Sequence, residues 1–449
     1  MTKSRAKPVT RRYGGYLATY DVAEDAELTH VGRGTPCGEY LRRAWQPAAL
    51  SRELGELPLN VRMLGEDLVL FRTRRGAVGL LGRHCSHRGA SLEYGVPTEE
   101  GLVCCYHGWH FAPDGTILET PNDPESQQRR KLCHPAYPTQ EYNGIIFAYM
   151  GPPDAVPAFA ILDSYRQPDT EMVPFTLHFP CNWLQVLENC QDPIHSCFLH
   201  TRVSGAQFAQ SWGELPELEY VETPIGMINV NVRRWKDKVW IRTTDVMFPN
   251  MNQTGALWLT AEEDATFLRS SLTRWMRPED DTSTRVIGWR YFNRATDPDA
   301  KGDKGQVGLG TIDFVGQTED ERPYAERQRI PGDFEAIVSQ RPIAIHGMEN
   351  LNRSDRGVIM LRKLLRQNIH AATEGRPCKA LDGGNAIVNT YTQDTVVTIP
   401  EGNGDDRALR RRAGEHVGRL VIDTGELPFE QRLAGFMAQL PRALAQARE

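Results

Sequence analysis

The chain has 449 residues, of which 40% are hydrophobic, so it can bury a large core, which we expect to be divided between two domains. A formal charge of −6 gives no positively charged surface for nucleic acid or an anionic membrane. The sequence also lacks the long apolar run that a membrane-spanning helix would need. Nine cysteines at irregular positions indicate free thiols in a reducing compartment rather than a disulfide framework, so we expect a soluble cytoplasmic protein.

The N-terminal part of the chain is expected to form an all-β domain. Residues 1–39 are interpreted as a basic arm, without the apolar segment of a secretory signal, that leads into a helix beginning near residue 38. Short runs rich in Val, Leu and Phe follow from residue 61, and the pair Asp114-Gly115 predicts a hairpin. These features place a β domain at residues 40–155.

The remaining residues, 156–449, are expected to form a larger domain after a Pro-rich linker at residues 154–167. Polar and apolar residues alternate in segments that are typical of an antiparallel sheet. The expected strands are residues 175–181, 227–235, 238–248, 255–262, 265–276 and 284–292. Helices are expected at residues 183–200, 333–348 and 357–371 and near the C-terminus. The predicted fold class is therefore α+β.

Two Cys–His pairs lie close together in the expected β domain. Cys85 and His87 have the spacing C-x-H, and Cys104 and His107 have the spacing C-x-x-H. Such a set could hold zinc, but each half supplies one thiolate and one imidazole, which suits a two-iron cluster with two thiolates on one iron and two imidazoles on the other. The segment between the pairs has the residue types of short β-strands rather than of a helix. Glycines follow both histidines, which favours two loops that close over one compact centre.

The stretches C-x-H-R-G-A-S-L and C-x-Y-H-G-W-x-F resemble the two loops of a Rieske [2Fe–2S] domain of the ring-hydroxylating oxygenase type. The resemblance implies that Cys85 and Cys104 bind one iron of the cluster and that His87 and His107 bind the other. In this family proline usually follows the second cysteine, whereas this chain has Cys105 there. Cys105 leaves the register open, although Cys104 gives the expected spacing to His107.

A second set of candidate ligands lies in a predicted helix of the larger domain. His195 and His200 are five residues apart, so both can reach one metal ion only if the helix bends or ends between them. With Asn189 and Asp192 they form the pattern N-x-x-D-x-x-H-x-x-x-x-H, which resembles the mononuclear iron site of Rieske oxygenases. The resemblance implies that the two histidines bind iron and that Asn189 and Asp192 are catalytic residues. Asp192 would join the iron site to a Rieske histidine of a neighbouring subunit, for which we favour His107.

The third iron ligand is expected far downstream. The stretch ENLNRSDRGVIMLRK resembles the segment that follows this ligand in the family, and the family's spacing implies Asp333, with Glu335 as the alternative. Asp333 could instead be the N-cap of the helix that is expected to start there. Two histidines and one carboxylate are the ligand set of iron that activates dioxygen.

The resemblance extends over about residues 30–370 and implies the oxygenase component of a Rieske non-heme iron oxygenase, similar to the phthalate dioxygenase-like and aryl O-demethylase branch. It implies a helix-grip catalytic domain, a Rieske [2Fe–2S] cluster, a mononuclear Fe(II) and a head-to-tail homotrimer. The glycine-rich residues 302–310 do not match a dinucleotide fingerprint, so we expect a separate NAD(P)H-dependent reductase. The expected reaction is hydroxylation or O-demethylation of a small aromatic substrate, and the alternative is monooxygenation of a non-aromatic small molecule.

The charge of the substrate depends on the direction of several arginine side chains. An arginine that faces the iron would favour an aromatic carboxylate, whereas the simpler expectation for each is exposure on the solvent face of the sheet. The candidates on predicted strands are Arg233, Arg234, Arg242, Arg269 and Arg274. Two other classes stay open, namely a Rieske electron carrier without catalysis, which would need only residues 40–155, and a zinc-stabilised interaction protein, which would be colourless.

Overall fold

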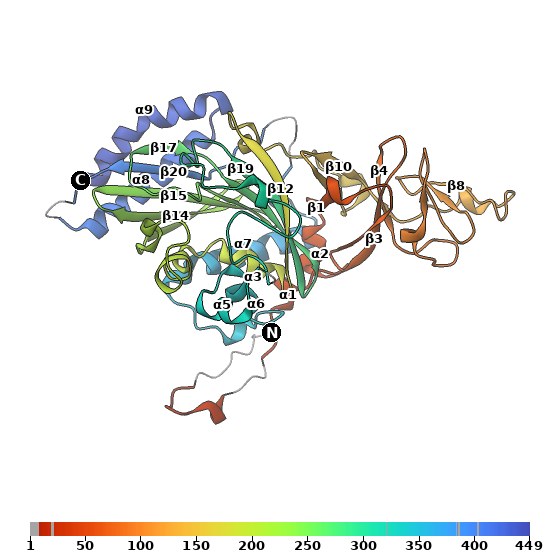
Figure 1. The fold of residues 1–449 in the computed structure, drawn as a ribbon, viewed down its shortest axis with the longest axis horizontal. Coiled ribbons are helices and arrows are strands. Elements are labelled where there is room, and N and C mark those ends of the chain that lie inside the picture. Colours follow the sequence, from red (N-terminus) through yellow and green to blue (C-terminus); the bar gives the residue numbers. More distant parts are fainter. Residues whose placement is uncertain (1–8, 19–21, 320, 383, 385–386, 402–403) are drawn as a thin grey trace.

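The computed structural model describes residues 9–18, 22–319, 321–382, 384, 387–401 and 404–449. Figure 1 shows a group of small β-sheets at one end of the molecule and a larger sheet with helices on both faces at the other. The chain therefore has the α+β fold that its sequence predicts. None of the helices in the described ranges is both long and apolar enough to cross a membrane.

Three antiparallel sheets form the N-terminal β part, at the right of Figure 1. In pairing order their strands are β2 (Leu59–Met63), β3 (Glu66–Arg72), β4 (Val78–Gly82) and β9 (Ala136–Tyr137); β5 (Val96–Pro97), β6 (Leu102–Val103), β7 (His110–Phe111) and β8 (Ile117–Glu119); and β1 (Trp45–Leu50), β11 (Ile145–Tyr149) and β10 (Thr139–Tyr142). The predicted hairpin at Asp114-Gly115 is confirmed, because it joins β7 to β8 and Gly115 has a φ of +86°. Phe71 and Phe111 belong to the buried cluster between the first two sheets, which also contains Cys85 and Cys104.

The larger domain is built on a nine-stranded antiparallel sheet. Its strands pair in the order β12 (Glu171–Phe179), β19 (Ser283–Phe292), β18 (Leu272–Asp280), β16 (Met251–Thr254), β15 (Lys238–Met247), β14 (Gly226–Trp235) and β13 (Glu217–Thr223), while β20 (Gln393–Thr398) pairs with β15 and β17 (Ala265–Leu268). The α-helices in the described ranges are α1 (Ala26–Thr29), α2 (Pro36–Leu41), α3 (Trp183–Asn189), α4 (Pro193–Cys197), α5 (Tyr324–Arg329), α6 (Asp333–Val338), α7 (Arg356–Thr373), α8 (Asp406–Gly425) and α9 (Phe429–Arg448).

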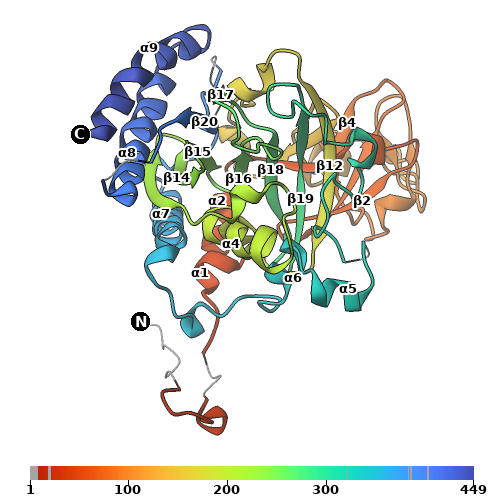
Figure 2. The same ribbon diagram turned by 60° about the vertical axis from the view of Figure 1, so that its left-hand side comes forward.

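The two faces of the large sheet are covered by different helices, which lie on opposite sides of it in Figures 1 and 2. Ile228, Val230 and Val232 alternate along β14 and pack with residues of α8 and α9 in one apolar cluster. Asn229 and Asn231 lie between them and point to the other face, because successive residues of a strand face opposite ways. Helices α3, α6 and α7 lie on that side. The polar residues of the sheet are therefore enclosed between the sheet and the helices.

Several predicted elements have other boundaries in the structure. The helix expected at residues 183–200 is divided into α3, α4 and a π-helix at Phe198–Val203. The helix expected at residues 333–348 ends at Val338, because Arg341 has a positive φ of 87° and Pro342 follows it.

Two strand predictions were also wrong. Residues 255–262 form turns rather than a strand, and residues 265–276 are divided into β17 and β18. The place beside β15 is taken by β20, which comes from more than a hundred residues further along the chain. A long-range pairing of this kind leaves no local pattern in the sequence.

Candidate functional site

Two loops of similar backbone geometry carry the candidate cluster ligands. In each loop the amide of a glycine donates to the carbonyl of the cysteine four residues earlier, from Gly89 to Cys85 at 2.8 Å and from Gly108 to Cys104 at 3.1 Å. The two glycines have φ values of +75° and +74°, a left-handed conformation that glycine adopts without steric cost. The sequence places glycine at both positions for this reason.

The cysteine and histidine side chains of the two loops lie together. Cys85 and Cys104 are buried in the same cluster, and burial raises the pKa of the Cys85 thiol to about 11. The rings of His87 and His107 lie edge to face with their centroids 4.5 Å apart. Cys105 is exposed, so the structure brings Cys104, rather than Cys105, together with Cys85.

The ring of His87 is held in place from one side. It stacks on the indole of Trp109 at a centroid distance of 4.9 Å, and Trp109 Nε1 donates to Asn122 Oδ1 at 2.8 Å. His87 Nδ1 is buried and has no hydrogen-bond partner in the described part of the chain. A buried nitrogen without a partner is costly, and a metal ion is one group that would satisfy it. With two thiols and a second imidazole nearby, these side chains fit a [2Fe–2S] cluster that has mixed Cys and His ligands.

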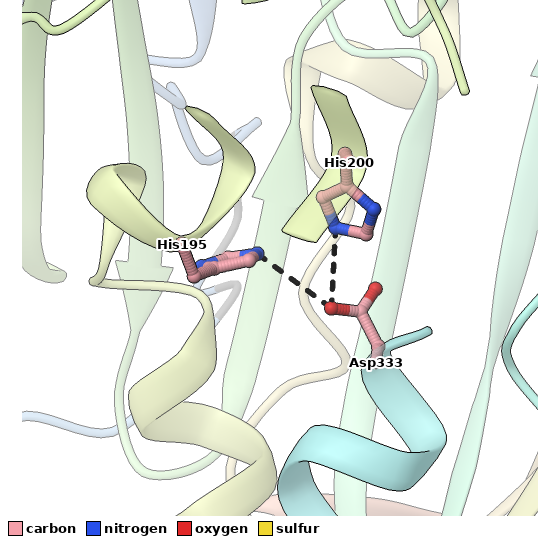
Figure 3. A group of neighbouring side chains, drawn as sticks. All are labelled: His195, His200 and Asp333. Atoms are coloured by element: carbon pink, nitrogen blue, oxygen red, sulfur yellow. Dashed lines mark ion pairs between the residues drawn. The ribbon is translucent and has the colours of Figure 1, made fainter. Parts of the chain in front are cut away.

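The second candidate centre lies where α4 ends. His195 is on α4, which ends at Cys197, and His200 is on the π-helix that follows, so the helix does change between the two histidines as the spacing requires. Figure 3 shows both rings turned toward Asp333, the first residue of α6. Asp333 Oδ1 lies 3.6 Å from His195 Nε2 and 3.2 Å from His200 Nε2. The three side chains thus offer ligand atoms that all lie within 4.8 Å of one another.

Hydrogen bonds on the far side of each imidazole fix which nitrogen faces this centre. His195 Nδ1 donates to the backbone carbonyl of Asp192. His200 Nδ1 donates to Gln207 Oε1 at 2.7 Å, while Gln207 Nε2 donates to the carbonyl of Val315, which sets the orientation of the amide. Both Nε2 atoms are therefore unprotonated in the neutral rings and can bind a metal ion.

The carboxylate of Asp333 is held by amides rather than by its own helix. Gln317 Nε2 donates to Oδ2 at 2.8 Å, and Asn189 Nδ2 donates to Oδ1 at 3.3 Å. Burial alone would raise the pKa of Asp333, but the two histidines and the Gln317 amide outweigh it and hold the pKa well below its usual range. The N-cap interpretation is wrong, because Gly332 is the N-cap and Glu335 accepts its amide.

These donors fit a mononuclear iron site. Two neutral imidazoles and one charged carboxylate converge from one side, which is the ligand set of non-heme Fe(II) that activates dioxygen. Glu335, the alternative third ligand, instead lies near Arg322 and Arg327. Gln207 and Gln317 were missed by sequence reasoning, because no local pattern connects them to the histidines or to Asp333.

A second group of possible ligands, Glu188, His346 and Glu349, lies elsewhere in the domain. Both carboxylates form ion pairs with the guanidinium of Arg362, with Nε–Oε1 and Nη1–Oε2 distances of 2.5 Å. One of the two negative charges of this group is therefore balanced by Arg362, and both carboxylates belong to a structural ion-pair network.

A cavity of about 100 Å³ opens beside the His195, His200 and Asp333 side chains. Its floor is the inner face of the large sheet, which contributes residues at alternate positions of the strands. Its other walls combine the candidate metal ligands and polar residues of α3 and α4 with an aromatic group, Phe208, Trp212 and Phe314. The polar residues that the sheet contributes are Asn229, Asn231, Arg233, Arg242, Thr244, Thr254 and Arg274, and Asn189, Asp192 and Ser196 add polar groups from α3, α4 and the turn between them. The apolar lining residues include Phe208, Trp212, Leu257, Leu272 and Phe314.

The expectation that the arginines lie on the solvent face of the sheet is wrong for those that line this cavity. Arg233, Arg242 and Arg274 face it instead of solvent, because the other face of the sheet is covered, by α8 and α9 at β14 and β15 and by Phe147 of β11 at β18. Arg234 points to that other face and bonds to Asp406 of α8. Arg269 pairs with Asp163 at 2.7 Å, away from the cavity.

An electron-transfer domain joined to a site of this kind defines an iron-dependent oxygenase. A family model described as the Rieske [2Fe-2S] domain matches residues 44–138. The chain is 42% identical over 427 residues, and 90% of each chain, to the oxygenase subunit of a tert-butanol monooxygenase / tert-amyl alcohol desaturase from Aquincola tertiaricarbonis. It is 36% identical over 398 residues, 84% of this chain and 91% of the relative, to the phenoxybenzoate dioxygenase subunit alpha of Ectopseudomonas oleovorans.

Solved structures share the fold. NdmA of Pseudomonas putida CBB5 superposes with a TM-score of 0.56 at 20% identity, covering 76% of this chain and 94% of that one. Dicamba monooxygenase bound to dicamba gives a TM-score of 0.53 at 20% identity, covering 75% of this chain and 99% of that one. The chain belongs to the Rieske non-heme iron oxygenases as an oxygenase subunit. It is an oxidoreductase whose cofactors are a Rieske [2Fe–2S] cluster and mononuclear iron.

Proposed function

We propose that this chain is a cytoplasmic terminal oxygenase that uses dioxygen and electrons from a separate NAD(P)H-dependent reductase to hydroxylate a compact organic molecule. Cys85, Cys104, His87 and His107 hold the cluster in this proposal. The mononuclear iron is held by three further residues, His195, His200 and Asp333. The observation that carries the choice of substrate is the small cavity beside those three side chains.

The size of the cavity favours a substrate smaller than a substituted benzene ring. An engineered protein cavity of about 150 Å³ accommodates benzene, whereas this one measures about 100 Å³. A branched molecule with four to six or so non-hydrogen atoms suits such a space better. The relative from Aquincola tertiaricarbonis, named for tert-butanol and tert-amyl alcohol, points the same way. An aromatic carboxylate is the second candidate, supported by the relative named for phenoxybenzoate.

The side chains of the cavity have separable tasks. Iron, when bound, supplies the activation of dioxygen. Phe208, Trp212 and Phe314 form an apolar wall next to His200, where they exclude water and pack against the alkyl part of the substrate. Polar groups of the sheet, such as Thr244, orient its oxygen atoms.

In this proposal Asp192 lies on the path by which electrons pass to the iron from the cluster of a neighbouring copy in a head-to-tail homotrimer. Its side chain is 35% exposed, and its backbone carbonyl accepts the hydrogen bond from His195 Nδ1. One hydrogen-bonded path would then connect the histidine ligand of the iron to a cluster histidine, His107 of the partner subunit, at this surface. Asp192 Oδ1 also caps α4 by accepting from the amide of Ile194 at 3.0 Å.

Asp192 both caps α4 and lies on the proposed electron path, and two substitutions can separate these roles. Asp192→Asn keeps an oxygen for the cap and removes the charge, whereas Asp192→Ala removes both. We expect both variants to retain cluster and iron, and the Asn variant to reoxidise its reduced cluster much more slowly than the wild type in stopped-flow mixing with dioxygen and substrate. Reoxidation of the Asn variant at the wild-type rate would refute the path.

The substrate proposal is tested by product analysis with a surrogate reductase. We expect hydroxylated products from compact alcohols and acids of four or five carbons, and little turnover of benzoates and methoxy-aromatics. Turnover of the aromatic compounds alone would establish the second candidate instead. Turnover with NAD(P)H and no reductase would contradict the proposed partner, and a protein without the red-brown Rieske absorption would contradict the cluster.

A further inference from the structure

The three arginines that line the cavity, Arg233, Arg242 and Arg274, differ in their hydrogen-bond partners. Arg242 forms two bonds with Asp394, from Nε to Oδ1 at 2.6 Å and from Nη2 to Oδ2 at 3.0 Å. Arg233 is only 1% exposed, and its donors are taken by Ser196 Oγ at 3.0 Å, by the carbonyl of Glu214 at 3.1 Å and by other groups around α4. Both guanidiniums are thus committed to protein partners.

Arg274 differs from these two residues. Its Nη2 donates to Cys190 Sγ at 3.3 Å and its Nε to Asn252 Oδ1 at 3.4 Å, which is a long and weak hydrogen bond. Within the described ranges no carboxylate forms an ion pair with Arg274, and no partner is seen for its Nη1. The side chain is only partly buried and lines the cavity. Its charge therefore faces the space that the substrate would occupy.

Arg274 is also close to the candidate iron ligands. Its partner Cys190 follows Asn189, whose amide donates to Asp333 at 3.3 Å. Arg274 and the side chains of His200 and Asp333 line the same cavity. An anion held by Arg274 would therefore lie within the same small cavity as the metal-binding side chains.

We propose that Arg274 is the anion-binding residue of this cavity and that the substrate is a short-chain carboxylate. A guanidinium without a counter-ion in a partly desolvated site favours a carboxylate, which it can bind with two parallel hydrogen bonds. The volume of about 100 Å³ leaves room for a short alkyl group, which packs on Phe208, Trp212 and Leu257. This inference rests on the proposed function and specifies its substrate class.

The reaction of such a substrate balances with the proposed electron source. A C–H bond of the alkyl group is replaced by C–OH, the second oxygen atom of dioxygen leaves as water, and two electrons from the reductase and two protons are consumed. The carboxylate on Arg274 does not react. Its task is to orient the alkyl group toward His195, His200 and Asp333, which requires a fixed anchor at the opposite end of a small molecule.

The test compares isobutyrate with isobutyramide, a neutral molecule of nearly the same shape, on the holoenzyme. We expect calorimetry to show isobutyrate binding at least about tenfold more tightly than the amide, as a charged hydrogen bond would give. Arg274→Gln should weaken isobutyrate binding about 10- to 100-fold and leave the amide nearly unchanged. Arg274→Lys should fall between, because lysine keeps the charge without the planar fork.

Arg294→Gln is the matched control, since Arg294 is exposed and outside the cavity. Cluster absorption and melting temperature establish that each variant is folded. Equal binding of acid and amide, unchanged in Arg274→Gln, would overturn the inference, while turnover of compact alcohols would leave the proposed function standing. If neither charged nor neutral compact molecules are oxidised in the presence of a competent reductase, both proposals fail.

Discussion

The amide of Gln317 provides a sharp test of the proposed iron site, because it touches the carboxylate and no other candidate ligand. Gln317 is 1% exposed, and its Nε2 donates to Asp333 Oδ2 at 2.8 Å. Gln317→Met preserves the length of the side chain and removes the donor. A hydrogen bond to a charged group contributes about 1.5–3 kcal/mol, and each 1.4 kcal/mol or so is tenfold in affinity. We therefore expect Fe(II) to bind about 10- to 100-fold more weakly, the range seen when groups that support metal ligands are removed.

The measurement is a chelator competition for Fe(II) on protein whose cluster is intact by visible absorption. Gln328→Met is the matched control, because Gln328 is exposed and its amide donates to Tyr324 on its own helix. This readout does not depend on substrate or reductase. An affinity of Gln317→Met equal to that of the control would refute the idea that Asp333 binds iron in the orientation set by Gln317.

Three further predictions concern the rest of the chain. Burial raises the pKa of Asp245 to about 6, so the free energy of unfolding decreases as the pH rises through that value. Asp245→Asn should therefore raise the melting temperature more at about pH 8 than at about pH 5. An equal effect at both pH values would contradict this. Cys104→Ser should abolish the cluster absorption, whereas Cys105→Ser, at an exposed position, should retain it. Gly108→Ala should lower cluster content and melting temperature more than Gly89→Ala. A Cβ at Gly108 would lie 2.9 Å from Pro121 Cγ, whereas a Cβ at Gly89 would meet no atom within 4 Å. Similar losses in both variants would show that backbone strain alone matters.

Local spacing in the sequence determined much of this protein. The two Cys–His pairs, with their following glycines, are each contained in a single loop, so their spacing alone predicts a common centre. His195 and His200 lie on one continuous segment, and the need for a change of helix between them followed from their separation, as α4 and the π-helix confirm. The α+β class and most strands of the large sheet also followed from alternation, which is a property of neighbouring residues.

Tertiary structure decided what neighbouring residues cannot specify. The strand β20 and the amides of Gln207 and Gln317 reach their partners across long stretches of chain, so no period or motif marks them. The direction of the arginines is the clearest case. Alternation in β18 shows that Arg274 and Trp275 face opposite ways, but not which face is enclosed. That choice depends on what covers the apolar face of the sheet. Helices α8 and α9, from the C-terminal end of the chain, pack on β14 and β15, while Phe147 of β11 packs on Trp275 of β18, and the polar face is left as the wall of the cavity.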